Sequence, residues 1–217
     1  MTCQAILFDL DGTLLDTLSD LAHSVNEVLS RLGYPVHPVE AYRFFVGEGI
    51  ETLIRRALPE GYAATDEQVK EIIIMMEKVY GRRWVEHTRP YDDIPEMLTW
   101  LEQRQVPKAI ISNKPDLFTR VMVRELLPDW QFKVVRGAMP GVPKKPDPAV
   151  PLEIARRLGA PPRRLMFVGD SSIDMLTAGA IGAYPVGVAW GFRPVRELLD
   201  NGAEAILNSP LDIIKLF

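Results

Sequence analysis

The 217-residue chain contains, close to its start, the stretch Ile6-Leu7-Phe8-Asp9-Leu10-Asp11-Gly12-Thr13-Leu14-Leu15-Asp16-Thr17. The apolar run from Ala5 to Phe8 is typical of a buried β-strand, and two carboxylates and a glycine follow it at once. Carboxylate oxygens bind hard cations, and the exposed amides of such a turn bind anions. The stretch suits a site for a phosphate ester and a magnesium ion directly after the first strand, but an ordinary strand followed by a polar turn has the same pattern, so the decision rests on features further along the chain.

The composition is that of a globular protein with a full core, because 47% of the residues are hydrophobic and 25% are charged. The net charge of -4 argues against nucleic acid or an anionic membrane as a partner, since both attract clustered basic residues. The single cysteine, Cys3, excludes an intrachain disulfide. We found no run of ~20 apolar residues and no signal core. These features predict a cytoplasmic protein. Whether it is a monomer or a homodimer stays open at this point.

Residues 16–86 have the pattern of helices and contain no good strand. Thr17-Leu18-Ser19-Asp20 resembles a capping box, and apolar side chains then recur at helical spacing as far as Gly33. Three further amphipathic helices are expected over residues 40–46, 50–58 and 66–80. Four such helices can bury their apolar faces against one another. The sequence thus predicts a small α-helical cap, residues 16–86, inserted after the first strand.

The rest of the chain alternates strands with helices. Apolar strands are expected over residues 106–111, 132–135, 164–168, 186–189 and 205–207. This alternation predicts an α/β fold with a Rossmann-like parallel sheet, covered by helices on both faces, formed by residues 1–15 and 87–217. Ligands bind at the carboxyl ends of the strands in such sheets. Four polar residues fall at or beyond those ends: Asp9, Ser112, Lys145 and Asp170.

Four motifs follow one another at these strand ends. They are Asp9-Leu10-Asp11-Gly12-Thr13, Ser112-Asn113-Lys114, Lys145-Pro146 and Gly169-Asp170-Ser171-Ser172-Ile173-Asp174. In order and spacing they resemble the four motifs of the haloacid dehalogenase-like hydrolase superfamily, over nearly the whole chain. The helical insert looks like the first-type cap of that superfamily. Three more stretches resemble its phosphoglycolate phosphatase branch: Val46-Gly47-Glu48-Gly49-Ile50-Glu51-Thr52-Leu53-Ile54, Asn113-Lys114-Pro115 and Ala189-Trp190-Gly191-Phe192.

The resemblance implies three catalytic residues. Asp9 would be the nucleophile that forms an aspartyl-phosphate, which splits one slow hydrolysis into two easier displacements. Asp11 would protonate the leaving alkoxide and later deprotonate the attacking water. Lys145 would neutralise the charge that develops on the phosphoryl oxygens. Without Asp11, the metal-free dehalogenase chemistry of the superfamily would fit better.

The resemblance also implies a magnesium site and a substrate site. Magnesium is expected to bind Asp9, Asp170 and the Asp11 carbonyl, with Asp174 in a supporting position behind them. Asp170, Asp174, Ser171 and Ser172 can equally serve as caps of the following helix. The residues expected to contact the substrate are Thr13, Ser112 and Asn113 in the core, with Gly47 and Glu48 in the cap.

Some candidate residues have weaker support. His23, His37 and His87 have no partner at ligand spacing in the sequence, so surface or packing roles are expected for them. Gly47-Glu48-Gly49 opens a cap helix rather than a βα turn, which argues against a dinucleotide loop. Arg193 could reach a second anionic group, and the sequence leaves open whether Arg55 and Arg56 contact substrate.

The hypothesis that fits best is a magnesium-dependent phosphatase of a small phosphorylated metabolite, with phosphoglycolate as the first expected substrate and a cap that excludes water. Alternatives with the same phospho-enzyme are a sugar-phosphate mutase, a pyrophosphatase and another sugar phosphatase. A last alternative is a regulatory module in which Asp9 accepts phosphate without turnover. The presence of Asp11 argues against that module, because a stable switch needs no acid/base to discharge it.

Overall fold

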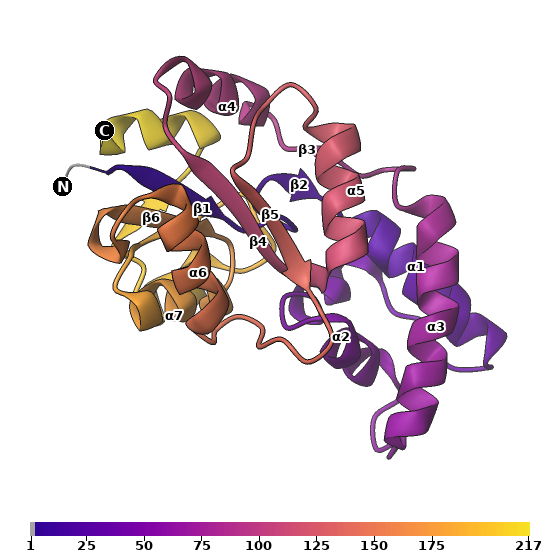
Figure 1. Cartoon of the computed structure of the whole chain (residues 1–217). Helices are drawn as coiled ribbons and strands as arrows, with labels where there is room; N and C mark the ends of the chain where they lie inside the picture. Colours follow the sequence, from indigo (N-terminus) through magenta and orange to yellow (C-terminus); the bar gives the residue numbers. More distant parts are fainter. Residues whose placement is uncertain (1–2) are drawn as a thin grey trace.

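The computed structural model describes residues 3–217, and its centre is a six-stranded parallel sheet (Figure 1). The strands lie in the order β5-β4-β1-β6-β7-β8, and each pairs in parallel with its neighbours. Their bounds are β1 Ala5–Phe8, β4 Lys108–Pro115, β5 Val134–Ala138, β6 Leu165–Gly169, β7 Tyr184–Val188 and β8 Ala205–Leu207. The predicted α/β fold with a Rossmann-like parallel sheet is therefore confirmed.

The uninterrupted apolar run of β1 follows from its central place in this sheet. Ile6 and Phe8 belong to one buried cluster, and Ala5 and Leu7 belong to a second. Successive side chains of a strand point to opposite faces, so both faces of β1 are covered. The helices that cover the two faces are α4 (Ile94–Gln103) and α5 (Asp116–Leu126) on the first, and α6 (Ala149–Leu158) and α7 (Ser172–Ile181) on the second.

The remaining helices of this part are α8 (Val195–Asp200) and two 3₁₀ helices, η2 (Pro162–Arg164) and η3 (Pro210–Leu216). Ile213 of η3 packs into the same cluster as α4. Within residues 3–217, no helix is both long enough and apolar enough to cross a membrane.

Four helices within residues 18–83 form a group with its own core, on one side of the sheet (Figure 1). They are α1 (Leu18–Arg31), η1 (Val39–Phe44), α2 (Ile50–Ala57) and α3 (Asp66–Arg83). Tyr42 and Tyr80 are among the largest fully buried side chains of this core. The helix expected over residues 40–46 is a 3₁₀ helix. The boundaries 16–86 proposed for a cap domain stay a prediction.

The prediction of a capping box at the start of α1 is wrong. The Thr17 side chain makes no capping hydrogen bond, and the Leu18 amide donates to Asp16 Oδ1 instead, at 3.4 Å. The physical reason is that the Asp20 carboxylate is bound elsewhere, to residues His87 and Thr88. By contrast, Thr65 and Gln68 form a complete capping box at α3.

A two-stranded antiparallel ribbon, not predicted from the sequence, joins the helical group to the sheet. It pairs β2 (Leu15–Asp16) with β3 (Arg89–Pro90), in the register Leu15 to Pro90 and Asp16 to Arg89. The chain therefore enters and leaves the helical group at neighbouring points.

Candidate active site

The candidate site lies at the carboxyl ends of the central strands. Asp9 follows β1 directly, Ser112 and Asn113 lie in the last part of β4, and Asp170 follows β6. Lys145 reaches the same place from the loop between β5 and α6. The topology thus brings together four motifs that are far apart in the sequence, because β1 pairs with β4 on one side and β6 on the other.

A buried lysine joins two carboxylates of the site. Lys145 Nζ lies 2.7 Å from Asp9 Oδ1 and 2.7 Å from Asp174 Oδ1, and all three side chains are buried. Burial raises the pKa of Asp9 to about 7, with a further rise from Asp174, while Lys145 opposes the shift. Burial lowers the pKa of Lys145, but the two carboxylates outweigh it and hold this pKa above its ordinary value. Lys145 therefore carries a positive charge between Asp9 and Asp174.

Asp170 approaches the backbone of two loops very closely. The Phe192 amide donates to Asp170 Oδ2 at 2.7 Å, and Thr13 Oγ1 lies 3.5 Å from Oδ1. A Cβ added at Gly12 would lie 2.3 Å from Asp170 Oδ2, and one at Gly191 would lie 2.2 Å from Asp170 Cβ. Gly12 also has a φ of +83°, in the region that favours glycine. These glycines let the carboxylate reach the space beside Asp9.

Three carboxylates could hold a metal ion. Asp9, Asp170 and Asp174 each offer an oxygen, and these oxygens lie within 4.8 Å of one another. Asp174 is already occupied, because Oδ1 binds Lys145 and Oδ2 accepts hydrogen bonds from Ser171 N and Oγ. Burial raises the pKa of Asp170 well above its ordinary value, as do the charges of Asp174 and Asp9. A set of carboxylate oxygens that repel one another is a fitting donor set for a hard cation such as magnesium.

Lys114 was not among the predicted site residues, yet it contacts one of them. Its Nζ lies 3.0 Å from Asp11 Oδ1 and 3.3 Å from Oδ2, and 4.7 Å from the centroid of the Tyr80 ring. Burial lowers the pKa of Lys114, but Asp11 outweighs this effect and raises it overall. The apolar run predicts a strand that ends at residue 111, whereas β4 continues to Pro115. A strand predicted to continue through Lys114 would have indicated that this lysine is buried beside the site.

Ser112 and Asn113 have different places in the site. Asn113 Nδ2 donates to the backbone oxygens of Gly47 and Lys145, both at 3.1 Å, and Asn113 Oδ1 accepts from Lys145 N at 2.9 Å. The Asn113 side chain therefore positions the loop that carries Lys145. Ser112 Oγ accepts from the Lys114 amide at 3.2 Å, which leaves its hydroxyl hydrogen for a bound group.

A cavity of about 50 Å³ opens between the strand ends and the helical group. Its polar lining comes from Asp9, Asp11, Ser112, Asn113 and Lys114. Its apolar lining comes from both parts of the molecule: Leu21, Val46, Ile50, Leu53, Met76, Tyr80, Pro115 and Phe118, with Gly47 and Gly49. The cavity is thus charged at one end and apolar over most of its wall.

The structure does not bring every predicted substrate residue to this cavity. Gly47 lines it, but the Glu48 side chain pairs with Arg56 at the surface, so the expected contact of Glu48 with substrate is not supported by its position. Arg55 pairs with Glu51 and Asp66. Each of these charges has a partner close by on the helical group, which holds it away from the cavity.

Arg193 connects the two parts of the molecule instead of lining the cavity. Its guanidinium donates to the backbone oxygens of Val46 at 3.0 Å and Phe44 at 3.3 Å. It lies over the Phe44 ring, 5.3 Å from the centroid. In this arrangement Arg193 holds the loop before α2 against the core.

The metal-free protein offers a test of the Asp9 environment. The pKa of Asp9 rises from 3.8 to about 7 on folding, so the stability tied to its protonated form is fully present below pH 3.8 and is lost as pH rises through about 7. Asp9→Asn cannot ionise. We expect the urea midpoint of Asp9→Asn minus that of wild type, both in chelator, to increase between about pH 5 and pH 8. A difference that stays constant would contradict the raised pKa.

The sequence is similar to curated phosphatases. It is 36% identical to the phosphoglycolate phosphatase of Pseudomonas syringae pv. syringae over 94% of this chain and 75% of that protein. It is 35% identical to the phosphoglycolate phosphatase of Pseudomonas putida over 89% of this chain and 72% of that protein. Among solved structures, a predicted phosphoglycolate phosphatase from Haemophilus somnus matches with a TM-score of 0.91 and 26% identity, over 100% of this chain and 98% of that one.

The family model of haloacid dehalogenase-like hydrolases matches residues 6–188, which include all four motifs. The resemblance to this superfamily and to its phosphoglycolate phosphatase branch, inferred from the motifs, is confirmed. The chain belongs to the haloacid dehalogenase-like hydrolase family.

Proposed function

We propose that this protein is a magnesium-dependent phosphatase that hydrolyses a small phosphorylated acid, phosphoglycolate or a close analogue, through an aspartyl-phosphate on Asp9. Hydrolysis of phosphoric monoesters is the activity named for the phosphoglycolate phosphatases to which the chain is similar. The observation that carries the proposal is the position of Asp9. It lies beside Lys145 and lines a small cavity that Asp11 also lines.

In the first step, an oxygen of Asp9 attacks phosphorus and the bond from phosphorus to the substrate oxygen breaks. Asp11 donates a proton to that leaving oxygen, so that an alcohol rather than an alkoxide departs. Lys145 holds Asp9 Oδ1 at 2.7 Å and lowers the repulsion between the carboxylate and the phosphoryl group. The Ser112 hydroxyl would donate to a phosphoryl oxygen, because its oxygen accepts from the Lys114 amide and its hydrogen is left for another group.

In the second step, Asp11 takes a proton from a water molecule, and the resulting hydroxide attacks the phosphorus of the aspartyl-phosphate. The bond between phosphorus and Asp9 breaks, which releases inorganic phosphate and restores the Asp9 carboxylate. Asp11 also regains its proton for the next cycle. One carboxylate thus serves both steps, because its protonation state alternates between them.

The metal site fits magnesium. Asp9 and Asp170 have oxygens that point into the shared space, while Asp174 is held by Lys145 and Ser171. Asp9, Asp170 and the Asp11 carbonyl would hold the ion, as the sequence predicts, and Asp174 would support them. Magnesium would supply positive charge to the phosphoryl oxygens and to the crowded carboxylates. Asp174 fixes Lys145 in the same place, which keeps a second positive charge at the site.

The cavity favours a short acidic leaving group. Among its described lining residues, Lys114 is the one with a basic side chain, and the opposite wall is apolar. The Lys114 ammonium has three donors, and its Nζ lies 3.0 and 3.3 Å from the two oxygens of Asp11. A donor that Asp11 does not use would bind a carboxylate of the substrate. A sugar phosphate would need partners for several hydroxyls that this wall does not offer.

Lys114→Met tests this assignment through a ratio. We expect the ratio of kcat/KM for phosphoglycolate to that for propyl phosphate, which has no carboxylate, to fall about 10- to 100-fold, the range for a lost charged hydrogen bond. The ratio cancels any effect on Asp11 that both substrates share. Exposed Lys133→Met is the control and should leave the ratio unchanged. An equal loss of kcat/KM for both substrates would show that Lys114 does not bind the carboxylate of the substrate.

We further propose that the helical group, residues 16–86, acts as a cap that closes over the substrate. Two contacts support this role: Asn113 bonds to Gly47, and Arg193 bonds to the loop before α2. Both join the sheet to the helices beside the cavity. Closure would exclude bulk water while the leaving group is bound.

The function is tested by phosphate release from a panel of about twenty phosphorylated metabolites, with magnesium and with a chelator. Magnesium-dependent release, with preference for phosphoglycolate, is the expected result. Interconversion of sugar phosphates without release would favour the mutase, and release from pyrophosphate or from hexose phosphates would favour the corresponding phosphatase. A phosphorylated Asp9 that persists without any turnover would favour the regulatory module.

A further inference from the structure

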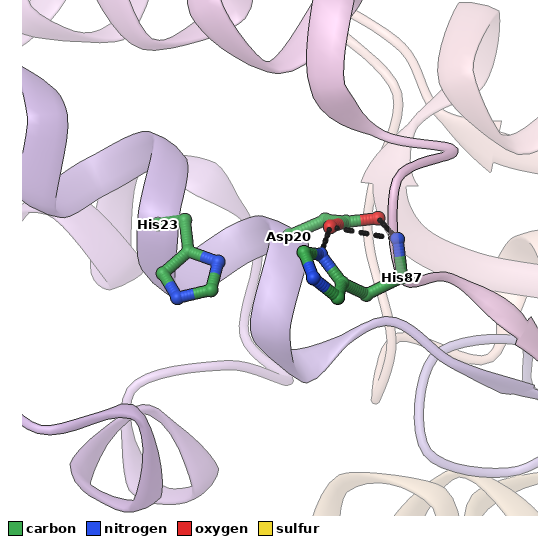
Figure 2. Close-up of side chains that lie close together, drawn as sticks. All are labelled: Asp20, His23 and His87. Carbon is green, nitrogen blue, oxygen red and sulfur yellow. Dashed lines mark hydrogen bonds and ion pairs between the residues drawn. The ribbon is translucent and has the colours of Figure 1, made fainter.

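Two histidines and one aspartate gather where the helical group meets the ribbon, outside the cavity at Asp9. They are Asp20 and His23 on α1 and His87 in the segment between α3 and β3 (Figure 2). One nitrogen of each ring and one carboxylate oxygen lie within 4.8 Å of one another. The expectation that these histidines are isolated is therefore wrong for His23 and His87. The sequence could not show it, because His87 comes from a distant segment.

Asp20 is the fixed member of this group. Its carboxylate is buried and accepts hydrogen bonds from four donors: the His87 amide at 3.0 Å, His87 Nδ1 at 2.8 Å, the Thr88 amide at 2.9 Å and Thr88 Oγ1 at 2.8 Å. Burial raises the pKa of Asp20, but these hydrogen bonds outweigh it and lower the pKa overall. A carboxylate bonded to an imidazole is the arrangement that orients a histidine toward a metal.

His23 supplies the second imidazole. It lies three residues after Asp20, so the two side chains share one face of α1. Its Nδ1 atom is buried and has no hydrogen-bond partner among the residues that the structure describes. A buried ring nitrogen without a partner is costly unless another group binds it.

The two rings have a separation that suits a shared ion. Their centroids lie 5.5 Å apart at an interplanar angle of 62°. With metal–nitrogen bonds of ~2.0–2.1 Å, two imidazoles on one tetrahedral ion place their centroids about 5 Å apart. The side chain of His87 is 52% exposed, so it has room to rotate and close the remaining gap.

We propose that His23 and His87, with Asp20 positioning the His87 ring, form a second metal site, which takes a divalent transition ion such as Zn²⁺ rather than magnesium. Imidazole nitrogens prefer Zn²⁺, Cu²⁺ and Ni²⁺, whereas magnesium prefers a shell of oxygens. The site is independent of the proposed substrate, because none of its three residues lines the cavity.

The position of the site gives it a mechanical consequence. His23 belongs to α1, which follows β2, and His87 belongs to the segment that leads into β3. An ion bound to both would tie together the two chain segments through which the helices join the sheet. If the helices must move for product to leave, such an ion slows turnover without touching the reacting groups.

Binding is measured by titration calorimetry with Zn²⁺ at pH 7.5, with magnesium in large excess to occupy the carboxylates at Asp9. We expect one equivalent of Zn²⁺ to bind wild type, and His23→Gln and His87→Gln to weaken it by more than about tenfold. His37→Gln is the matched control, since His37 lies elsewhere on the helical group and bonds to Ala57 O. It should bind Zn²⁺ like wild type.

Two results would overturn the site: no Zn²⁺ bound by wild type, or the same affinity in both glutamine variants. A thermal melt without metal guards against misfolding, because the variants should melt close to wild type and lose only the rise in Tm that Zn²⁺ produces. For the mechanical consequence, one equivalent of Zn²⁺ should lower kcat in wild type and in His37→Gln, but not in His23→Gln. Equal inhibition of all three would place the inhibitory ion elsewhere.

Discussion

Asp9→Asn should lower kcat by at least ~10⁴-fold, the scale of losing the nucleophile of a covalent mechanism. The amide is a far weaker nucleophile than the carboxylate, and it cannot form the acyl phosphate. The substitution keeps the shape of the side chain and removes a buried negative charge that Asp174 and burial both oppose. The folded protein should therefore persist, and the loss should appear in chemistry rather than in structure.

The measurement is steady-state phosphate release, together with an acid quench during turnover of labelled substrate. Wild type should give a labelled protein, and Asp9→Asn should give none. Asp92→Asn, an exposed aspartate, is the control and should keep full activity. Substantial turnover by purified Asp9→Asn would rule out the covalent route and leave direct attack by water.

Lys145→Met should have the second largest effect, and it should lower both the free energy of unfolding and kcat. Methionine keeps much of the volume but removes the positive charge between Asp9 and Asp174. Breaking a buried ion pair by removing one partner costs ~3–5 kcal/mol, because the other charge stays buried and unpaired. Loss of one group that stabilises developing charge costs ~10²–10³-fold in kcat. Both losses are expected in the same variant.

The stability part is checked by urea unfolding with chelator and with magnesium. Magnesium should stabilise Lys145→Met more than wild type, because it replaces part of the lost charge. Lys108→Met is the matched control: Lys108 is as buried, but it pairs with Glu102, and it begins the same strand that carries Ser112. It should lose stability without a loss of activity or a larger response to magnesium. A normal kcat in Lys145→Met would remove Lys145 from the catalytic machinery.

Much of the fold could be predicted from the sequence because its signals are local. The run from Ala5 to Phe8 has no polar residue, as a strand covered on both faces requires. The helix expected from residue 66 begins at that residue, because Thr65 and Gln68 form a capping box there. The four motifs could be placed at strand ends because polar residues follow apolar runs there. In each case the decisive neighbours are a few residues apart.

The parts that were missed depend on distant partners. From the sequence, Lys114 is expected in a loop, because the apolar run ends before Ser112. Its partner Asp11 is 103 residues away, so no local pattern indicates the contact. Asp20 reads as the end of a capping box, yet its hydrogen bonds come from residues 67 and 68 positions later. Contacts between residues so far apart depend on the tertiary fold and cannot be predicted from local sequence patterns.

The ribbon of β2 and β3 has an evolutionary consequence. Asp16 and Arg89 are direct partners in it, so the whole segment between them leaves and rejoins the core at a single place. A segment attached in this way can be exchanged, shortened or enlarged as a cassette, because the register of the six parallel strands does not depend on it. Under the cap role proposed above, replacing this segment should change the substrate range while the residues at the strand ends stay as they are.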